Sequence, residues 1–278
     1  MQEGNKEHIR SIYGKKEEKG ISTYRDVGNG GLFLVAACAA CIGKDVQKGI
    51  EKGLKEKGSI PYQEVGISDD ELSQKYYYQQ LEDGEKQAYK EIVQGVKENV
   101  EEIYVHASDA DRTNMLFQYV LKDFPEIFWC DGMTTSTSYE GSEAYTVLKP
   151  VYLYDAGQKE AMKAKIEASV NECLASMPAK DTDYQKILYV YEYIVNTVDY
   201  DLEAADNQNI YSVFVNRRSV CAGYSKATQY LLERLGVFCT YVTGTTLDGQ
   251  SHAWNLVRCS GNYYYVDTTW GDPVFQAA

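Results

Sequence analysis

The sequence predicts an α+β protein in which a mainly helical lead-in, residues 69–178, precedes a mixed C-terminal core, residues 180–278. Apolar residues recur at three- and four-residue steps between Tyr89 and Val100, as one face of a helix requires. Beyond Val237 apolar and polar residues alternate instead, which is typical of half-buried strands. We therefore expect helices first and a sheet near the end of the chain.

The composition fits a globular protein and argues against several classes of function. The 278 residues include 28 Lys and Arg against 41 Asp and Glu, which gives a formal net charge of −13. Such an acidic balance argues against nucleic acid as the main partner. The apolar runs stay below the ~20 residues that a membrane-spanning helix needs. The seven cysteines are irregularly spaced, so we expect no dense disulfide framework. The sequence has three histidines, so few of them are available to pair with a cysteine in catalysis or metal binding.

Residues 1–60 form a segment of different character that we cannot place in the fold. They carry 11 basic and 8 acidic side chains, whereas residues 61–278 carry a net charge of −16. Their apolar stretch, Leu32 to Ile42, has the length of a signal-peptide core, and Val35-Ala36-Ala37-Cys38 resembles a bacterial lipoprotein cleavage box. This favours an extracellular or cell-surface protein, anchored to the membrane through a lipidated Cys38. A small buried helix in a cytoplasmic protein is the alternative that these residues leave open.

The lead-in is expected to contain four helices and a strand region, and a fifth helix begins the C-terminal core. The first helix runs from its cap at residues 68–70 toward Leu81, and the second begins at Asp83 and carries its apolar face to Ile103. The third opens at residues 108–111 and stops at Pro125.

The second half of the lead-in changes pattern. Residues 139–154 alternate and predict strands that Pro150 breaks. Two amphipathic helices follow, over roughly 158–175 and 182–197. The second of them begins the C-terminal core.

Cys221 is placed in the first turn of a helix. Apolar residues between Tyr224 and Leu235 recur with helical spacing, and Gly236 ends the helix. A helix N-terminus carries about half a positive charge and unpaired amides, which favour a thiolate and can hold a developing oxyanion. A buried structural cysteine is the alternative that this motif alone leaves open.

A β-hairpin is expected to bring His252 and Asp267 together. In a strand over residues 251–258, His252 and Trp254 share one face, whereas Asn255 lies on the other and is expected to be structural. A turn and a return strand follow, and the return strand ends at Asp267. Asp267 can then hydrogen-bond the imidazole, fix its tautomer and stabilise its charged form.

Three motifs of this region, in this order, resemble the bacterial transglutaminase-like superfamily. They are Val220-Cys221-Ala-Gly223-Tyr224-Ser225, His252-Ala-Trp254-Asn255 and Tyr265-Val-Asp267-Thr-Thr-Trp270-Gly-Asp272-Pro273. The resemblance covers residues 180–278 strongly and 75–180 more loosely, where it is to the segment that precedes the core in secreted Firmicute members. It implies a papain-like core, with a cysteine-bearing helix packed on an antiparallel sheet. Relatives usually continue beyond the position of Ala278, so we expect a core that is truncated or is completed by the N-terminal segment.

The resemblance implies a Cys-His-Asp enzyme. Cys221 is the implied nucleophile, His252 the general base and then acid, and Asp267 the residue that orients the imidazole. The implied reaction is acyl transfer from a glutamine carboxamide or a peptide bond through a thioester. Transfer to an amine is cross-linking, and transfer to water is deamidation or proteolysis.

The remaining expectations concern what the site contacts. Trp254, Trp270 and Tyr224 are expected to bind substrate, and a place in the core is the alternative for the two tryptophans. The partner is expected to be a protein or peptide. The implied chemistry needs neither a metal nor an organic cofactor. A non-catalytic, surface-displayed module that binds peptides or glycans on the same fold is the alternative.

Overall fold

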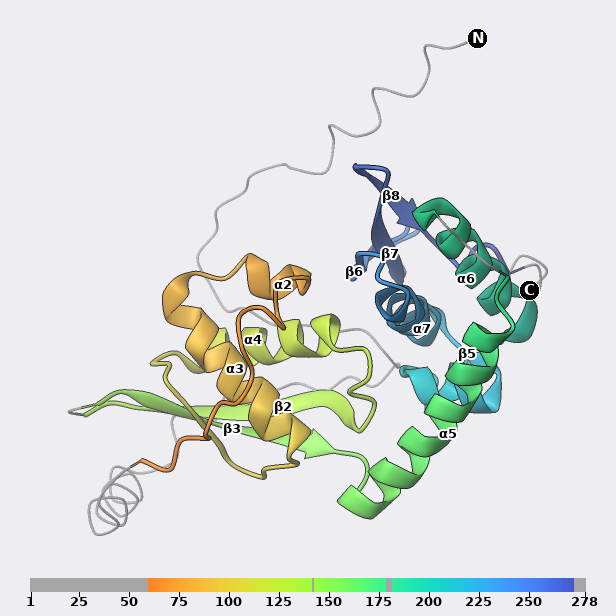
Figure 1. The fold of residues 1–278 in the computed structure, drawn as a ribbon. Helices are drawn as coiled ribbons and strands as arrows, with labels where there is room; N and C mark the ends of the chain where they lie inside the picture. Colours follow the sequence, from red (N-terminus) through yellow and green to blue (C-terminus); the bar gives the residue numbers. More distant parts are fainter. Residues whose placement is uncertain (1–59, 142, 179–181, 273–278) are drawn as a thin grey trace. The chain divides into compact units, whose positions relative to one another are not determined.

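The computed structural model describes residues 60–141, 143–178 and 182–272, drawn in colour in Figure 1. The expectations for the N-terminal segment, including the apolar stretch and a lipidated Cys38, lie outside the described residues and stay predictions. Among the helices of the described ranges, none is long and apolar enough to cross a membrane.

The lead-in opens with helices that are shorter than the sequence pattern predicts. Its first elements are α2 (Tyr76–Gln79), α3 (Asp83–Lys97), β1 (Ile103–Val105) and α4 (Ala110–Asp123). The helix expected from residue 68 is reduced to α2, because the Asp123 carboxylate accepts the backbone N–H groups of Tyr77 and Tyr78 and starts the helix there. Helix α3 ends before Ile103, because Asn99 adopts a left-handed conformation with φ 57°.

A three-stranded antiparallel sheet joins these helices, in the order β1-β3-β2. Strand β2 (Cys130–Tyr139) is rich in Thr and Ser, so it lacks the apolar alternation that would have predicted it. Strand β3 (Tyr145–Tyr152) continues through Pro150, where a break was expected. Since β1 pairs only with residues 146–148, Pro150 lies where β3 has a neighbour on one side alone, and there a strand tolerates proline.

Two long helices follow, close to the predicted ranges. They are α5 (Ala156–Ala175) and α6 (Asp183–Thr197). The short strands β4 (Asp199–Tyr200) and β5 (Arg218–Ser219) then pair in parallel, and a π-helical turn, η1 (Ser212–Asn216), lies between them in the sequence. None of these last three elements was expected. Strand β5 is followed by Val220 and then by the helix that begins with Cys221.

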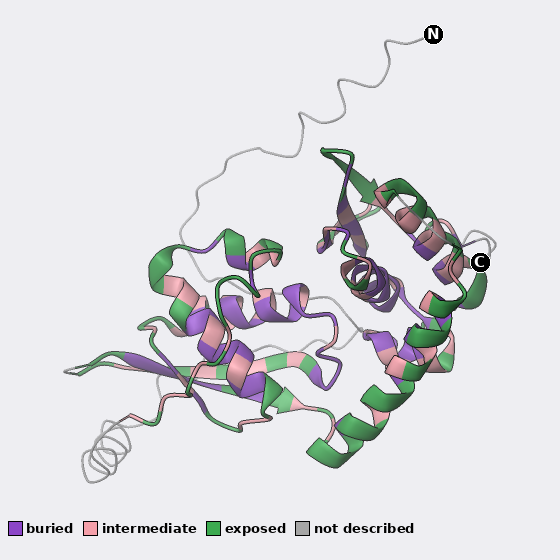
Figure 2. Cartoon of the chain, in the orientation of Figure 1, coloured by how far each residue is buried: buried purple, intermediate pink, exposed green. Residues whose placement is uncertain are grey.

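The C-terminal core ends in the helix and sheet that the sequence predicts. Helix α7 (Cys221–Arg234) packs against a sheet of order β6-β7-β8, made of β6 (Cys239–Thr245), β7 (Ser251–Cys259) and β8 (Asn262–Val266) (Figure 1). Figure 2 shows α7 largely buried, whereas α5 exposes most of its surface.

The hydrophobic core is continuous between the two parts. Leu148 of the lead-in and Leu231 of α7 belong to the same cluster of buried side chains. The boundary drawn near residue 179 therefore stays a prediction.

Candidate active site

Cys221 is the first residue of α7, as predicted. The preceding Val220 is extended and provides no side-chain cap for the helix, whereas α3, α5 and α6 each begin with a capping box. The first-turn amides of α7 are therefore not occupied by a side-chain oxygen from the N-cap position. Cys221 is partly exposed and lies at the positive end of a helix.

Gly223 lets the preceding loop pack directly against the first turn of α7. A Cβ atom at this position would lie 2.0 Å from the Ser219 Oγ and 3.0 Å from the Asn207 carbonyl oxygen. The Ser219 hydroxyl is itself fixed, because it bonds the Asn207 carbonyl at 2.9 Å and the Ser212 hydroxyl at 2.6 Å. This buried polar contact sets the position of the helix end, and with it that of Cys221.

The structure brings His252 and Asp267 together as the sequence predicts. His252 Nε2 lies 2.7 Å from Asp267 Oδ2. The register pairs Asn255 with Val266, so Asp267 continues opposite Trp254 and reaches His252 diagonally. Its other oxygen, Oδ1, accepts the backbone N–H groups two and three residues further on, at 3.1 and 3.0 Å. Both carboxylate oxygens are thus engaged, which fixes the direction of the hydrogen bond to the imidazole.

His252 is held in a state that favours the imidazolium. Burial lowers its pKa, but the hydrogen bond with Asp267 and the interaction with the Cys221 side chain raise it more, to about 9. At neutral pH the ring is therefore predominantly protonated. Because Nε2 faces Asp267, Nδ1 is the ring nitrogen left for the sulfur of Cys221.

Two indole rings stack on the imidazole. The ring centroids of Trp254 and Trp270 lie 5.7 and 5.0 Å from that of His252, with interplanar angles of 26° and 18°. Trp254 reaches this place by crossing Gly244 on the neighbouring strand, where a Cβ atom would lie 2.6 Å from the indole. Trp270 is 50% exposed, so it is open to solvent beside the site. Their expected contact with substrate stays a proposal.

Tyr224 does not fit the substrate-binding role that was expected of it. Its side chain is fully buried, and its hydroxyl donates toward the Val198 carbonyl at 2.8 Å and Asp272 Oδ2 at 2.6 Å. The sequence pattern misled because Tyr224 lies one turn after Cys221 but on the core side of α7. Asn255 is structural as predicted, since its amide nitrogen donates to the Ser225 carbonyl at 3.0 Å.

The other described cysteines differ from Cys221 in their burial. Burial raises the pKa of Cys130 to about 12 and also raises the pKa values of Cys173 and Cys239. These three remain thiols at neutral pH and are poor nucleophiles. Within the described residues no group of three or more His, Cys, Asp and Glu side chains could hold a metal ion.

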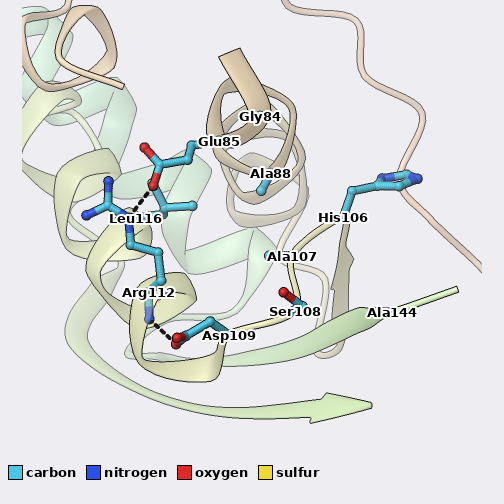
Figure 3. A pocket seen from close by; sticks show the side chains of 10 residues that line it. All are labelled: Gly84, Glu85, Ala88, His106, Ala107, Ser108, Asp109, Arg112, Leu116 and Ala144. Carbon is cyan, nitrogen blue, oxygen red and sulfur yellow. Dashed lines mark hydrogen bonds and ion pairs between the residues drawn. The ribbon is translucent and has the colours of Figure 1, made fainter. Parts of the chain in front are cut away.

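A cavity of about 420 Å³ in the lead-in lies outside this set of residues. It is lined by His106, Ser108, Arg112 and residues around them from α3 and α4 (Figure 3). The Arg112 side chain already pairs with Glu85, and Figure 3 shows the His106 ring pointing away from Ser108. The cavity therefore does not set a nucleophile against its imidazole.

Comparison with known proteins identifies the family of this region. Residues 173–268 match the model of the Transglutaminase-like superfamily. The matched range contains Cys221, His252 and Asp267, and this part of the chain is a transglutaminase-like domain with the corresponding fold. That assignment confirms the predicted family and fold class. The bacterial and secreted character of the chain stays a prediction.

The curated relatives share only part of their length with this chain. The Kyphoscoliosis peptidase of Mus musculus is 24% identical over 136 residues, which are 43% of this chain and 21% of that protein. The Kyphoscoliosis peptidase of Homo sapiens is 26% identical over 106 residues, 32% of this chain and 16% of that protein. The chain thus spans about a fifth of the length of these relatives.

Solved structures show a distant likeness. A TGase crystal structure aligns with 60% of this chain and 51% of its own at 13% identity and a TM-score of 0.35. The periplasmic domain of TgpA from Pseudomonas aeruginosa aligns with 49% of this chain and 58% of its own at 15% identity and a TM-score of 0.31. The domain assignment rests on the family model.

Proposed function

We propose that this chain is a thiol acyltransferase that cleaves amide bonds of a protein or peptide through a thioester on Cys221. The observation that carries the proposal is the double engagement of His252, which hydrogen-bonds Asp267 and interacts with the side chain of Cys221. The domain assignment supports it, and so does the name of the curated relatives, which are peptidases.

In the first half of the reaction, the sulfur of Cys221 attacks the carbonyl carbon of the amide. The carbonyl oxygen becomes an oxyanion, and the uncapped first-turn amides of α7, that of Cys221 among them, are placed to donate to it. As the C–N bond breaks, the imidazolium of His252 gives its proton to the departing nitrogen. Ammonia or an amine leaves, and a thioester remains on the sulfur.

In the second half, the neutral imidazole acts as a base. It takes a proton from an incoming amine or water, which attacks the thioester carbonyl. The sulfur leaves as a thiolate beside the imidazolium that has formed, and the protein is ready for another substrate. Throughout the reaction Asp267 hydrogen-bonds Nε2 and so holds the ring with Nδ1 toward the sulfur.

The test is mass spectrometry of a model glutamine peptide incubated with the protein and a primary amine. Amine incorporation adds the mass of the amine less ammonia, deamidation adds about 1 Da, and proteolysis gives two fragments; each outcome supports acyl transfer and identifies its class. The Cys221→Ala variant is the matched control, because Ala is tolerated in the first turn of a helix. An unchanged peptide, with wild-type protein shown to be folded, contradicts the proposal and favours a peptide- or glycan-binding module.

A further inference from the structure

Asp272 is a buried carboxylate whose partner comes from the helix of Cys221. Its side chain is 1% exposed, and its Oδ2 lies 2.6 Å from the hydroxyl oxygen of Tyr224. Residues 267–272, which we call the acid loop, begin at Asp267 and include Trp270. One hydrogen bond between two buried side chains therefore ties the far end of the acid loop to α7.

Two further contacts hold the acid loop in place. The Thr268 hydroxyl lies 3.2 Å from the Thr228 hydroxyl, which projects from α7 one turn after Tyr224. Gly271 packs against α6, where a Cβ atom would lie 1.9 Å from the Tyr191 hydroxyl oxygen. The acid loop thus contacts α7 through Thr268 and α6 through Gly271, and the hydrogen bond with Tyr224 holds its last residue, Asp272.

The acid loop is braced by hydrogen bonds between its own residues. Asp267 accepts the backbone N–H groups of Thr269 and Trp270, and the Asp272 N–H donates to the Thr269 carbonyl at 3.1 Å. A displacement at Asp272 is therefore passed to the carboxylate of Asp267. Strand β8 ends at Val266, so the acid loop lies outside the hydrogen-bonded ladder of the sheet.

We propose that Tyr224 and Asp272 are positioning residues that lock the acid loop onto α7 and so keep Asp267 within hydrogen-bond distance of His252. The catalytic consequence rests on the function proposed above, whereas the effect on the imidazole does not. Tyr224 is suited to the task because its hydroxyl also reaches the Val198 carbonyl at 2.8 Å. The hydroxyl oxygen of Tyr224 therefore connects α7 both to the end of α6 and to the acid loop.

The test is an NMR titration of the histidine side chains, of which the chain has three. In the wild type the His252 pKa should be about 9. Tyr224→Phe removes the hydroxyl and leaves the ring in the core; it should lower this pKa by about one unit or more, because the Asp267 contact lengthens. The matched control is Tyr152→Phe, which removes a hydroxyl that donates to the Val100 carbonyl at 2.9 Å in the lead-in. It should leave the His252 pKa unchanged.

Asp272→Asn serves as the second variant and should act in the same direction as Tyr224→Phe. Thermal melts of all variants separate a loss of stability, which Tyr152→Phe also produces, from a change at the imidazole. In turnover, kcat should fall about tenfold to a hundredfold in Tyr224→Phe and Asp272→Asn, with KM little changed. If Tyr224→Phe and Asp272→Asn are both folded and both keep the wild-type His252 pKa, the proposal is overturned. An inactive wild type with the expected pKa changes contradicts the proposed function alone.

Discussion

Among residues 60–141, 143–178 and 182–272, two histidines contact a carboxylate, and their surroundings differ. His106 bonds the buried carboxylate of Glu91 in the lead-in, and His252 bonds Asp267 in the C-terminal core. Each imidazole stacks on an aromatic ring, which for His106 is Tyr62 at 3.6 Å between centroids. The His106 side chain is 43% exposed, whereas that of His252 is 8% exposed.

The difference lies on the far side of the ring. His252 presents its second nitrogen to a cysteine at an uncapped helix end, whereas the Nε2 of His106 faces another carboxylate, Glu143, at 3.8 Å. Helix α4, which begins near His106, is capped by Asp109. A histidine–carboxylate pair alone is therefore not sufficient for the proposed chemistry, which also needs a nucleophile and a free helix terminus.

The largest expected effect separates the two histidines. His252→Gln should lower turnover by about a thousandfold or more, because no other base or acid faces Cys221 in the proposed mechanism. His106→Gln should leave kcat within about twofold of the wild type. The same peptide assay measures both variants, and equal losses in the two would break the comparison.

The second comparison replaces each carboxylate by its amide. Asp267→Asn should lower kcat by about a hundredfold or more. It should also lower the His252 pKa from about 9 toward the ordinary 6.5, so that activity, which needs the imidazolium, is lost at a lower pH as the pH rises. Glu91→Gln should cost about 1–3 kcal/mol of stability through its buried hydrogen bonds and leave the pH profile unchanged. The measurement is the pH–rate profile of the wild type, Asp267→Asn and Glu91→Gln. If Asp267→Asn loses activity at the same alkaline pH as the wild type, the assignment of Asp267 as the partner of His252 is contradicted.

The third prediction concerns the helix end. Gly223→Ala should slow alkylation of Cys221 about tenfold and cost about 1–3 kcal/mol, because the new methyl group meets Ser219 and Asn207. Gly84→Ala, in the first turn of α3, is the matched control, since a Cβ atom there meets nothing within 4 Å. Chemical denaturation and the alkylation rate provide the two readouts. Equal behaviour of the variants would show that the loop does not position Cys221.

The smallest expected effect is on stability. The His252 pKa is raised in the folded protein, so its contribution is fully present below pH 6.5 and is lost as the pH rises through about 9. As the pH rises from 6.5 to about 9, the melting temperature of the wild type should therefore fall more than that of His252→Gln. His106→Gln should keep the wild-type decline, and a wild-type curve parallel to that of His252→Gln would argue against a raised pKa.

The sequence predicted the parts of the site that depend on short-range patterns. The helical period placed Cys221 in a first turn, and strand alternation placed His252 and Asn255 on opposite faces, as the structure has them. Strand β2 was missed because Thr and Ser at successive positions give no apolar period.

The contacts that hold the site together come from residues far apart in the sequence. Tyr224 was assigned to substrate, because helical spacing alone does not show which face meets the acid loop. The close approach of Ser219 to Gly223 depends on β4 pairing with β5, two strands of two residues each that no pattern could reveal. Asp272 was visible only as a motif residue without a role.

The central claim is that Cys221, and not another cysteine, is activated by His252. Competitive alkylation with limiting iodoacetamide, read at each of the seven cysteines by mass spectrometry, tests it directly. Cys221 should be modified first at pH 6 to 8, well before the buried Cys239, and His252→Gln but not His106→Gln should slow its modification at pH 6. Modification of Cys221 at the same rate in all three folded proteins, or no faster than that of Cys239, would contradict the account.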